Sequence, residues 1–435
     1  MDIVGLNINN IKMISKIKKE EKWLTNYRLS SYNHFNKIAL PNYISKMDID
    51  FQKIIYYRGK DNNSQNNWDN IDQDVKREIE DLGVLDSQSN FGGLGIQYES
   101  EVIYNNMIKE LKTRQVIFTS IETAIKKYPE LVKKHFGKIV SNNDNKFAAL
   151  NSAVFSGGIF IYIPPNTKLE RPLQSYFRIN SKNMGQFERT LIIVDDNSEL
   201  HYLEGCTAPI NSEDSLHAAV VEIYVGKNSK CRYSTIQNWS SNVYNLVTKR
   251  ALVMENGTME WIDGNIGSKI TMKYPACILQ GNNANGMCIT VSVASHNQNQ
   301  DTGARMIHIG KQTKSKIIAK SISKNGGKTT YRGKVDIKAS ALNSESLVKC
   351  DTLILDGFSV SDTIPINIIR NKTSFINHEA KISKIDEEKL FYLMSRGLNK
   401  EEASELIVLG FLEEFKEELP IEYAVELNQL LKKSL

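Results

Sequence analysis

The sequence has 435 residues, of which 41% are hydrophobic and 24% charged, a composition typical of a protein that folds around a hydrophobic core and not of a disordered chain. Its 55 Lys and Arg against 50 Asp and Glu leave a net charge of only +5, and the lysines are spread among acidic residues, which indicates solvated faces and not a patch for nucleic acid. No stretch approaches the roughly 18 uncharged apolar residues of a membrane-spanning helix, and residues 1–19 resemble neither a signal peptide nor a transit peptide.

Residues 1–145 are predicted to form mostly helices. Residues 23–40 place apolar and aromatic side chains at helical spacing, and further helices are expected at 99–112 and 120–136. Between them, residues 60–70 (KDNNSQNNWDN) are predicted to form an Asn-rich loop. This part of the sequence therefore indicates an N-terminal helical region.

From residue 146 to 382 the pattern changes to short runs of alternating apolar and polar residues, such as GGIFIYIP and AAVVEIYV. A turn residue, in most cases Asn followed by Ser, Thr or Gly, precedes these runs at Asn166, Asn197, Asn228, Asn256, Asn285, Gln312 and Asn343, with a weaker eighth member at Asn371. Subtracting neighbouring positions gives spacings of 31, 31, 28, 29, 27, 31 and 28 residues. A near-constant period with period-2 alternation predicts a β-solenoid, or β-helix, of roughly 30 residues per coil.

The last part of the chain, residues 383–435, returns to a helical pattern. Asp386 is placed to cap a first helix that Gly397 ends, and Asn399 with Glu402 forms a capping box for a second helix. We expect this C-terminal helical domain to cap the solenoid, to dock a partner, or both.

The five cysteines are an odd number without a CxxC pair or zinc-like spacing, which disfavours a zinc finger, thioredoxin chemistry and a disulfide scaffold.

The repeat predicts which residues of neighbouring coils lie side by side. Because strands of neighbouring coils lie ~4.8 Å apart, residues at equal offsets from the repeat turn are expected to be neighbours. This places Cys350 beside His378, each seven residues after a turn, and Cys206 beside Gln237, each nine residues after a turn. Cys350 and His378, with the adjacent Glu379, offer ligands for iron or zinc. Judged from spacing alone, buried core cysteines and a hydrogen-bonded histidine are the simpler interpretation.

Motifs along most of the chain resemble the SufB family of iron-sulfur cluster assembly scaffolds. The stretches that carry the resemblance run in order from about residue 98 to 431: KFAALNSAVFSGG, FRIN, GQFERT, YLEGCTAP, LHAAVVE, YSTIQNW, VTKRAL, KYPACILQG, DTGARMIHIG, TYRG, VKCDTLIL, HEAKISK, LFYLMSRG and ELPIEYAVE. The resemblance implies a fold that is mainly β with helical ends, a right-handed parallel β-helix between an N-terminal helical region and a C-terminal domain that docks the ATPase SufC. It also implies pairing with the related SufD, or with a second copy of the chain, and sulfur delivery as persulfide from a cysteine desulfurase and its transfer protein.

The same resemblance implies roles for individual residues. Cys206 resembles the persulfide-accepting cysteine of the family. Cys350 resembles the cysteine at the SufB–SufD interface where the nascent cluster forms, with His378 and Glu379 beside it as further iron ligands. The residues that resemble the lining of a sulfur path through the β-helix are Arg178, Asn180, Gln237, Trp239 and Lys249. The cluster is expected to be transient and of the 4Fe-4S type, and participation of a reduced flavin is left open.

Some features depart from the family or limit what this chain does alone. The family often has an acidic residue where this chain has Asn377, the loop at 60–70 lacks the cysteine cluster of some longer members, and the chain ends at Leu435 without the usual acidic tail. Residues 327–329 (GKT) match the end of a P-loop, but the first glycine of G-x-x-x-x-G-K-[ST] falls on Ile322. We therefore expect a scaffold that does not bind ATP itself and depends on ATP only through its partner SufC.

Two other functions stay open from the sequence. One is a SufD-like structural partner without sulfur chemistry, against which Cys206 and Cys350 argue. The other is a β-helix polysaccharide lyase or hydrolase, for which no acid pair stands at matching repeat offsets. Abundant Asn, Ile and Lys with few Pro are typical of an AT-rich genome, so we expect the bacterial cytoplasm, or the stroma of a plastid-type organelle such as an apicoplast if the gene is organellar.

Overall fold

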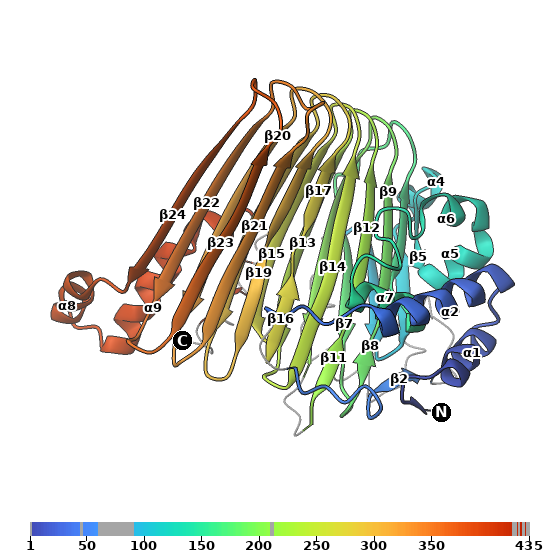
Figure 1. Ribbon diagram of the computed structural model, residues 1–435, viewed down its shortest axis with the longest axis horizontal. Helices are drawn as coiled ribbons and strands as arrows, with labels where there is room; N and C mark the ends of the chain where they lie inside the picture. The colour runs from blue at the N-terminus through green and yellow to red at the C-terminus, as the bar shows by residue number, and fades with distance from the viewer. Residues whose placement is uncertain are drawn as a thin grey trace.

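The computed structural model describes residues 2–43, 47–59, 91–208 and 213–419, with the single positions 424, 427, 428 and 431. In this part of the chain the strands wind into a parallel β-solenoid of about eight turns with helices at its ends, and Figure 1 shows the coils stacked along the long axis of the molecule. The fold class predicted from the repeat is confirmed. The Asn-rich segment at 60–70 lies outside the described residues. No helix among the described residues has the length and apolar character needed to cross a bilayer.

One wall of the solenoid is a sheet of ten strands among the described residues. In spatial order these are β24 (Phe375–Lys384), β22 (Glu345–Ile354), β20 (Lys314–Ser323), β18 (Asn285–Ala294), β15 (Thr258–Gly267), β13 (Lys230–Trp239), β10 (Glu199–Thr207), β7 (Leu173–Arg178), β3 (Gly93–Tyr98) and β4 (Glu101–Met107). All pairs are parallel except β3 with β4. Alternate side chains of each strand point into the solenoid, as the period-2 pattern predicts.

The facing wall is a second sheet of the described residues. Its main path runs β23 (Val360–Ile369), β21 (Lys328–Ile337), β19 (Asn299–His308), β16 (Ile270–Lys273), β14 (Val243–Val253), β12 (Val220–Val225), β9 (Arg189–Val194), β6 (Ile159–Ile163) and β5 (Ile117–Ser120), with β8 (Gly185–Gln186), β11 (Ser215–His217) and β17 (Ala276–Leu279) attached beside it. A separate antiparallel pair is β1 (Asp2–Val4) with β2 (Ile55–Arg58). The main hydrophobic core lies between the two walls.

The repeat turns follow the predicted positions with two exceptions. Positive φ angles, which Asn adopts more readily than most residues, occur at Asn166, Asn197, Asn228, Asn256, Asn283, Gln312 and Asn343. The first five are joined by side-chain amide hydrogen bonds of 2.9–3.0 Å from coil to coil. The fifth turn residue is thus Asn283 and not Asn285, which already begins β18. The eighth turn is displaced as well, because Asn343 N donates to Thr373 Oγ1 at 2.9 Å, two residues beyond the predicted Asn371.

The N-terminal helices agree only in part with the prediction. They are α1 (Ile8–Ile17), α2 (Lys22–Lys37), α4 (Lys109–Thr113), α5 (Ile121–Lys127), α6 (Pro129–His135) and α7 (Lys146–Val154). The predicted helix at 120–136 is divided where Pro129 starts α6. The helix predicted at 99–112 is confirmed only at its end, where 109–112 belong to α4. It is wrong before that, because residues of β4 pair antiparallel with β3 and bury Val102 and Tyr104. The ten-stranded sheet therefore starts before residue 146, and the domain limits at 145 and 382 stay predictions.

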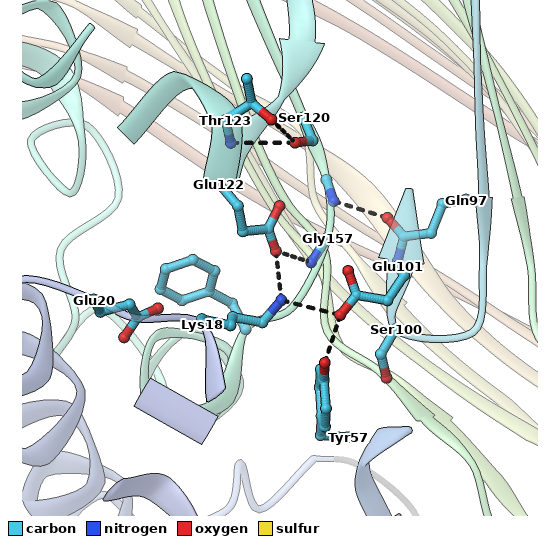
Figure 2. A network of polar contacts seen from close by, with 12 residues as sticks. Lys18, Glu20, Tyr57, Gln97, Ser100, Glu101, Ser120, Glu122, Thr123 and Gly157 are labelled. Atoms are coloured by element: carbon cyan, nitrogen blue, oxygen red, sulfur yellow. Dashed lines mark hydrogen bonds and ion pairs between the residues drawn. The ribbon is translucent and has the colours of Figure 1, made fainter. Parts of the chain in front are cut away.

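A buried ion pair fastens the N-terminal helices to the first coils. Lys18 Nζ donates to Glu122 Oε1 at 2.9 Å and lies 3.5 Å from Glu101 Oε1, which also accepts from the Tyr57 hydroxyl at 2.7 Å. Figure 2 shows Lys18 reaching between these two carboxylates, with Gly157 N donating to Glu122 from the other side. Although burial alone lowers the pKa of Lys18, the two carboxylates raise it above its ordinary value, so the side chain stays charged.

Part of the C-terminal helical segment covers the outer face of the ten-stranded sheet. Its helices are α8 (Glu387–Ser395), α9 (Lys400–Phe411) and α10 (Glu413–Lys416). The predicted caps are confirmed: Asp386 accepts two backbone N–H bonds, Gly397 has φ +100, and Asn399 and Glu402 form the capping box. Helices α9 and α10 pack on the sheet, and α8 contacts α9. The residues in this packing are Val408, Leu412 and Phe415 against Ile236, Ile262, Ile289 and Ile318.

Candidate functional site

A line of polar side chains runs from Cys206 along the interior face of the ten-stranded sheet, from strand to strand. Cys206 lies near the end of β10 and is 2% exposed. It pairs in register with Gln237, as predicted, and Gln237 Nε2 lies 3.8 Å from its Sγ. Continuing strand by strand, the register gives a set of buried residues that we call the polar column: Cys206, Gln237, Asn265, Ser292, Ser321 and Thr352.

The column beside it contains the second predicted cysteine. Its residues, in register, are Glu204, Thr235, Asp263, Thr290, Ala319 and Cys350. Cys206 and Cys350 thus face the same interior and lie five strand-to-strand steps apart, roughly 24 Å at ~4.8 Å per step. Across the interior, Ser292 Oγ bonds Thr302 Oγ1 at 2.7 Å, so the facing wall adds polar groups midway.

The amide of Gln237 has a fixed orientation. Its Oε1 accepts from Lys273 Nζ at 3.0 Å and from Asn245 Nδ2 at 2.8 Å. A lysine ammonium only donates, so the atom that it contacts must be the oxygen. The amide NH₂ group therefore faces the Cys206 sulfur, where it can stabilise negative charge.

Two lysines and two carboxylates share this buried space. Lys273 Nζ lies 2.8 Å from Asp263 Oδ1, and Lys249 Nζ lies 3.5 Å from the same atom and 3.6 Å from Glu204 Oε1. Burial lowers the pKa of Lys273 to about 8 despite the attraction of Asp263. For Lys249, burial also lowers the pKa, but Glu204 and Asp263 outweigh it and the pKa is raised. Lys249 Nζ has no hydrogen-bond partner among the described residues, so a buried cation beside Cys206 keeps donors to spare.

Cys206 rests as a thiol. Burial, with Glu204 and Glu188 nearby, raises the pKa of its thiol well above the ordinary value. The ring of the predicted path residue Trp239 packs at a tilt against that of His217, with centroids 4.7 Å apart. His217 Nδ1 in turn lies 2.7 Å from Asn245 Oδ1, so Trp239 borders the group that orients Gln237.

Arg178 and Asn180 lie at the edge of this arrangement. Arg178 ends β7 and pairs in register with Thr207, whereas Phe177 pairs with Cys206. Successive side chains of a strand point to opposite faces, so Arg178 does not continue the polar column. It donates to Asn180 Oδ1 at 3.4 Å, and the two residues flank the end of β10 together.

Cys350 and His378 meet at the C-terminal end of the solenoid. Cys350 Sγ lies 3.7 Å from His378 Nε2, and His378 Nδ1 lies 3.2 Å from Asn367 Nδ2. The predicted equal offset is wrong by two residues, because His378 pairs in register with Val348, but both side chains face the interior and reach each other. Burial raises the pKa of the Cys350 thiol to about 12 against the opposing hydrogen bond from the Tyr331 hydroxyl, and it lowers the pKa of His378. The imidazole is therefore neutral and able to bind a metal.

Glu379 is not brought to Cys350. It follows His378 on the strand and so points to the outer face, where it pairs in register with Lys349 and borders a groove of about 950 Å³ beneath α9. In the described ranges no group of three or more His, Cys, Asp and Glu side chains is placed to hold a metal ion. Of the three predicted iron ligands, the structure thus brings Cys350 and His378 together and leaves Glu379 apart.

Several interior residues escaped the sequence prediction although the repeat contained a signal for them. The offset of nine residues that linked Cys206 to Gln237 also selects Asn265, Ser321 and Thr352, and it selects Ser292 once the fifth turn is placed at Asn283. Lys273 lies on the facing wall in the short strand β16. No turn offset points to it, so the sequence held no signal for this residue.

Two family models and a set of curated relatives match the chain. Residues 177–411 match the SUF system FeS cluster assembly, SufBD core domain, and residues 97–175 match the SufBD protein N-terminal region. The iron-sulfur cluster assembly protein SufB of Bacillus subtilis (strain 168) is 52% identical over 430 residues, covering 98% of this chain and 92% of its own length. A SufBD family protein of Staphylococcus saprophyticus is 53% identical with the same coverage, and one of Staphylococcus aureus (strain MRSA252) is 52% identical. These matches confirm the resemblance carried by the motifs: the chain belongs to the SufBD family of iron-sulfur cluster assembly proteins.

Proposed function

We propose that this chain is a scaffold that accepts sulfur as a persulfide on Cys206, passes it along the polar column, and joins it with iron at Cys350. The observation that supports the proposal best is the polar column itself, because buried polar side chains are costly unless they are paired or used. The column begins at Cys206 and ends at Thr352, two residues from Cys350. Iron and sulfur are the cargo in this account, and the chain holds them only in transit.

The surroundings of Cys206 suit a sulfur anion. A persulfide on Cys206 would receive the N–H groups of Gln237, while Lys249 and Lys273 supply positive charge in a space closed to water. Hydrogen bonds to a charged group are roughly twice as strong as neutral ones. Lys249, with unused donors, is the residue best placed to accompany sulfur as it leaves Cys206.

The end of the solenoid near Cys350 supports the docking of a partner that completes the cluster site. Strands β23 and β24 are the terminal strands of the two sheets in the described chain. Their exposed apolar side chains include Phe375 (55% exposed), Ile366, Ile369 and Ile382. A SufD solenoid, or a second copy of this chain, would cover them and supply the ligands that Cys350 and His378 lack. A transient 4Fe-4S cluster shared between two chains fits such a divided ligand set.

The exposed helix α8 supports a second partner. Phe391, Tyr392 and Met394 are 73%, 56% and 41% exposed on it, which is unusual for side chains of this size without a partner. We assign this surface to SufC, whose ATP hydrolysis would open the cluster site.

The remaining partners are a cysteine desulfurase and its transfer protein. The bacterial relatives favour the bacterial cytoplasm as the place of action. Participation of a reduced flavin stays open.

Iron and acid-labile sulfide measured in the complex of this chain with SufC and SufD test the function. Anaerobic reconstitution with the desulfurase, cysteine and ferrous iron is expected to load the wild-type complex with comparable amounts of both. Cys206→Ser removes the sulfur acceptor and is expected to lower sulfide at least ~10-fold, because a serine hydroxyl cannot carry sulfane sulfur. Cys231→Ser, an equally buried thiol one strand away on β13, is the matched control.

A SufD-like role without sulfur chemistry is the alternative. It predicts that Cys206→Ser and Cys231→Ser complexes acquire the same iron and sulfide as wild type. Membership of the assembly family supports either of these roles over a polysaccharide-active enzyme.

A further inference from the structure

One carboxylate inside the solenoid touches the thiol that is to receive sulfur. Glu204 lies two residues before Cys206 on β10, faces the same interior and is 2% exposed. Its Oε1 lies 3.8 Å from Cys206 Sγ, with the thiol as donor. We propose, building on the function proposed above, that Glu204 is the general base that removes the Sγ proton of Cys206 during sulfur transfer.

Cys206 needs a base because its surroundings oppose a thiolate. Burial raises the pKa of the thiol, and thiolate, not thiol, is the nucleophile in persulfide transfer. The titratable groups that act on Cys206 are Glu204 on the same strand and Glu188, Lys249, Lys273 and Tyr233 on neighbouring elements. Among them Glu204 is the group in hydrogen-bond contact with the sulfur.

Glu204 is held in the position that a base requires. Its Oε2 accepts a hydrogen bond from the Tyr233 hydroxyl, and Lys249 Nζ lies 3.6 Å from Oε1. These two neighbours hold the carboxyl group in place, and carboxylate oxygens accept hydrogen bonds. The remaining lone pair of Oε1 is then available to the S–H group of Cys206. The Sγ–Oε1 distance is long for proton transfer, as is common for catalytic contacts before a substrate is bound.

The step balances without an oxidant. The Cys206 sulfur attacks the outer sulfur of a donor persulfide R–S–SH, the new Sγ–S bond forms, and the S–S bond of the donor breaks. The Sγ proton passes to Glu204 and from there to the leaving thiolate R–S⁻, which departs as R–SH. One sulfane sulfur moves between two thiols, Glu204 ends as a carboxylate again, and no net oxidation takes place.

The test is the initial rate of persulfide formation on Cys206 in the full chain purified with SufC and SufD. The donor is inorganic polysulfide, which is small enough for a buried thiol, and the modified peptide is quantified by mass spectrometry between pH 6 and 9 under argon. Glu204→Gln keeps the size of the side chain and removes the base, so it is expected to slow loading roughly 100-fold at pH 7, with a defect that shrinks as pH rises and hydroxide replaces the base. Glu260→Gln, which removes a carboxylate from the outer face of the same sheet, is the matched control.

The direction of the change in loading rate distinguishes a base from a carboxylate that only repels the Cys206 thiolate. If Glu204 only repels a thiolate, then Glu204→Gln lowers the pKa of Cys206 and loads as fast as wild type or faster, which would overturn the inference while the proposed function stands. A wild-type complex that never carries persulfide on Cys206 overturns both. If Glu204→Gln does not fold, Tyr233→Phe replaces it. This variant frees Oε2 from the hydroxyl that holds the carboxylate in place, and it is expected to show the same pH-dependent defect in weaker form.

Discussion

Replacing Cys350 by alanine is expected to abolish cluster formation on the reconstituted complex. The substitution removes the thiol that meets His378 at 3.7 Å and leaves the imidazole as the remaining ligand of this pair. Loss of groups that merely orient a metal ligand already costs 10–100-fold in metal affinity, so loss of the ligand itself is expected to reduce bound iron and acid-labile sulfide by at least ~10-fold. Persulfide on Cys206 should still form, because the two thiols lie five strands apart.

Cys288→Ala is the control for this result. Cys288 is a fully buried thiol on β18, two strands from Cys350 in the same sheet. Its replacement by alanine removes a thiol group, as Cys350→Ala does. Its substitution leaves a small cavity but keeps the contact between Cys350 and His378. Equal cluster content in Cys350→Ala and Cys288→Ala complexes would contradict the assignment of Cys350 as a ligand.

Glu222→Ala is expected to lower the free energy of unfolding by about 3–5 kcal/mol, because it strips a fully buried arginine of its charge partner. Glu222 Oε2 lies 2.6 Å from Arg189 Nη2, and neither side chain is exposed to solvent. The same carboxylate accepts backbone N–H bonds from Gly137, Ile139 and Val140, in the segment between α6 and α7. One substitution therefore leaves one charge and three donors unpaired. Chemical denaturation of the purified chain, followed by circular dichroism, measures the loss.

An exposed glutamate provides the comparison for this stability prediction. Glu255 lies 3.6 Å from Lys227 with both side chains about half exposed, so Glu255→Ala is expected to change stability by no more than about 1 kcal/mol. Similar denaturation midpoints for the two variants would mean that the N-terminal helices are not fastened to the solenoid through Glu222.

The sequence predicted the solenoid because its signal is repeated. Eight turns with similar spacing reinforce one another, so errors at Asn285 and Asn371 did not affect the fold class. The region before the repeat offered no such redundancy. Residues 99–112 have a pattern compatible with a helix, but pairing of β4 with β3 decides their structure, and a contact with another segment is not encoded in local spacing.

The site was predictable where it follows the repeat and unpredictable where it crosses between the walls. Cys206 and Gln237 are neighbours because they share an offset on one sheet. Glu379 was grouped with Cys350 because it adjoins His378 in sequence, yet neighbours along a strand face opposite sides. Lys273 fixes the Gln237 amide from the facing wall, and the turn spacing carries no information on which residues of the two walls meet.

The measurement that tests the central claim most directly follows labelled sulfur from Cys206 to Cys350. Cys206 in the complex is loaded once with persulfide carrying a heavy sulfur isotope, excess donor is removed, and both cysteine peptides are analysed by mass spectrometry as a function of time. Label is expected first on Cys206 and later on Cys350. Ser292→Val, which replaces the hydroxyl midway along the polar column by two methyl groups, is expected to hold the label at Cys206. Label that reaches Cys350 at the wild-type rate in Ser292→Val, or that appears on Cys350 when Cys206 is replaced by serine, would contradict a sulfur route through the solenoid.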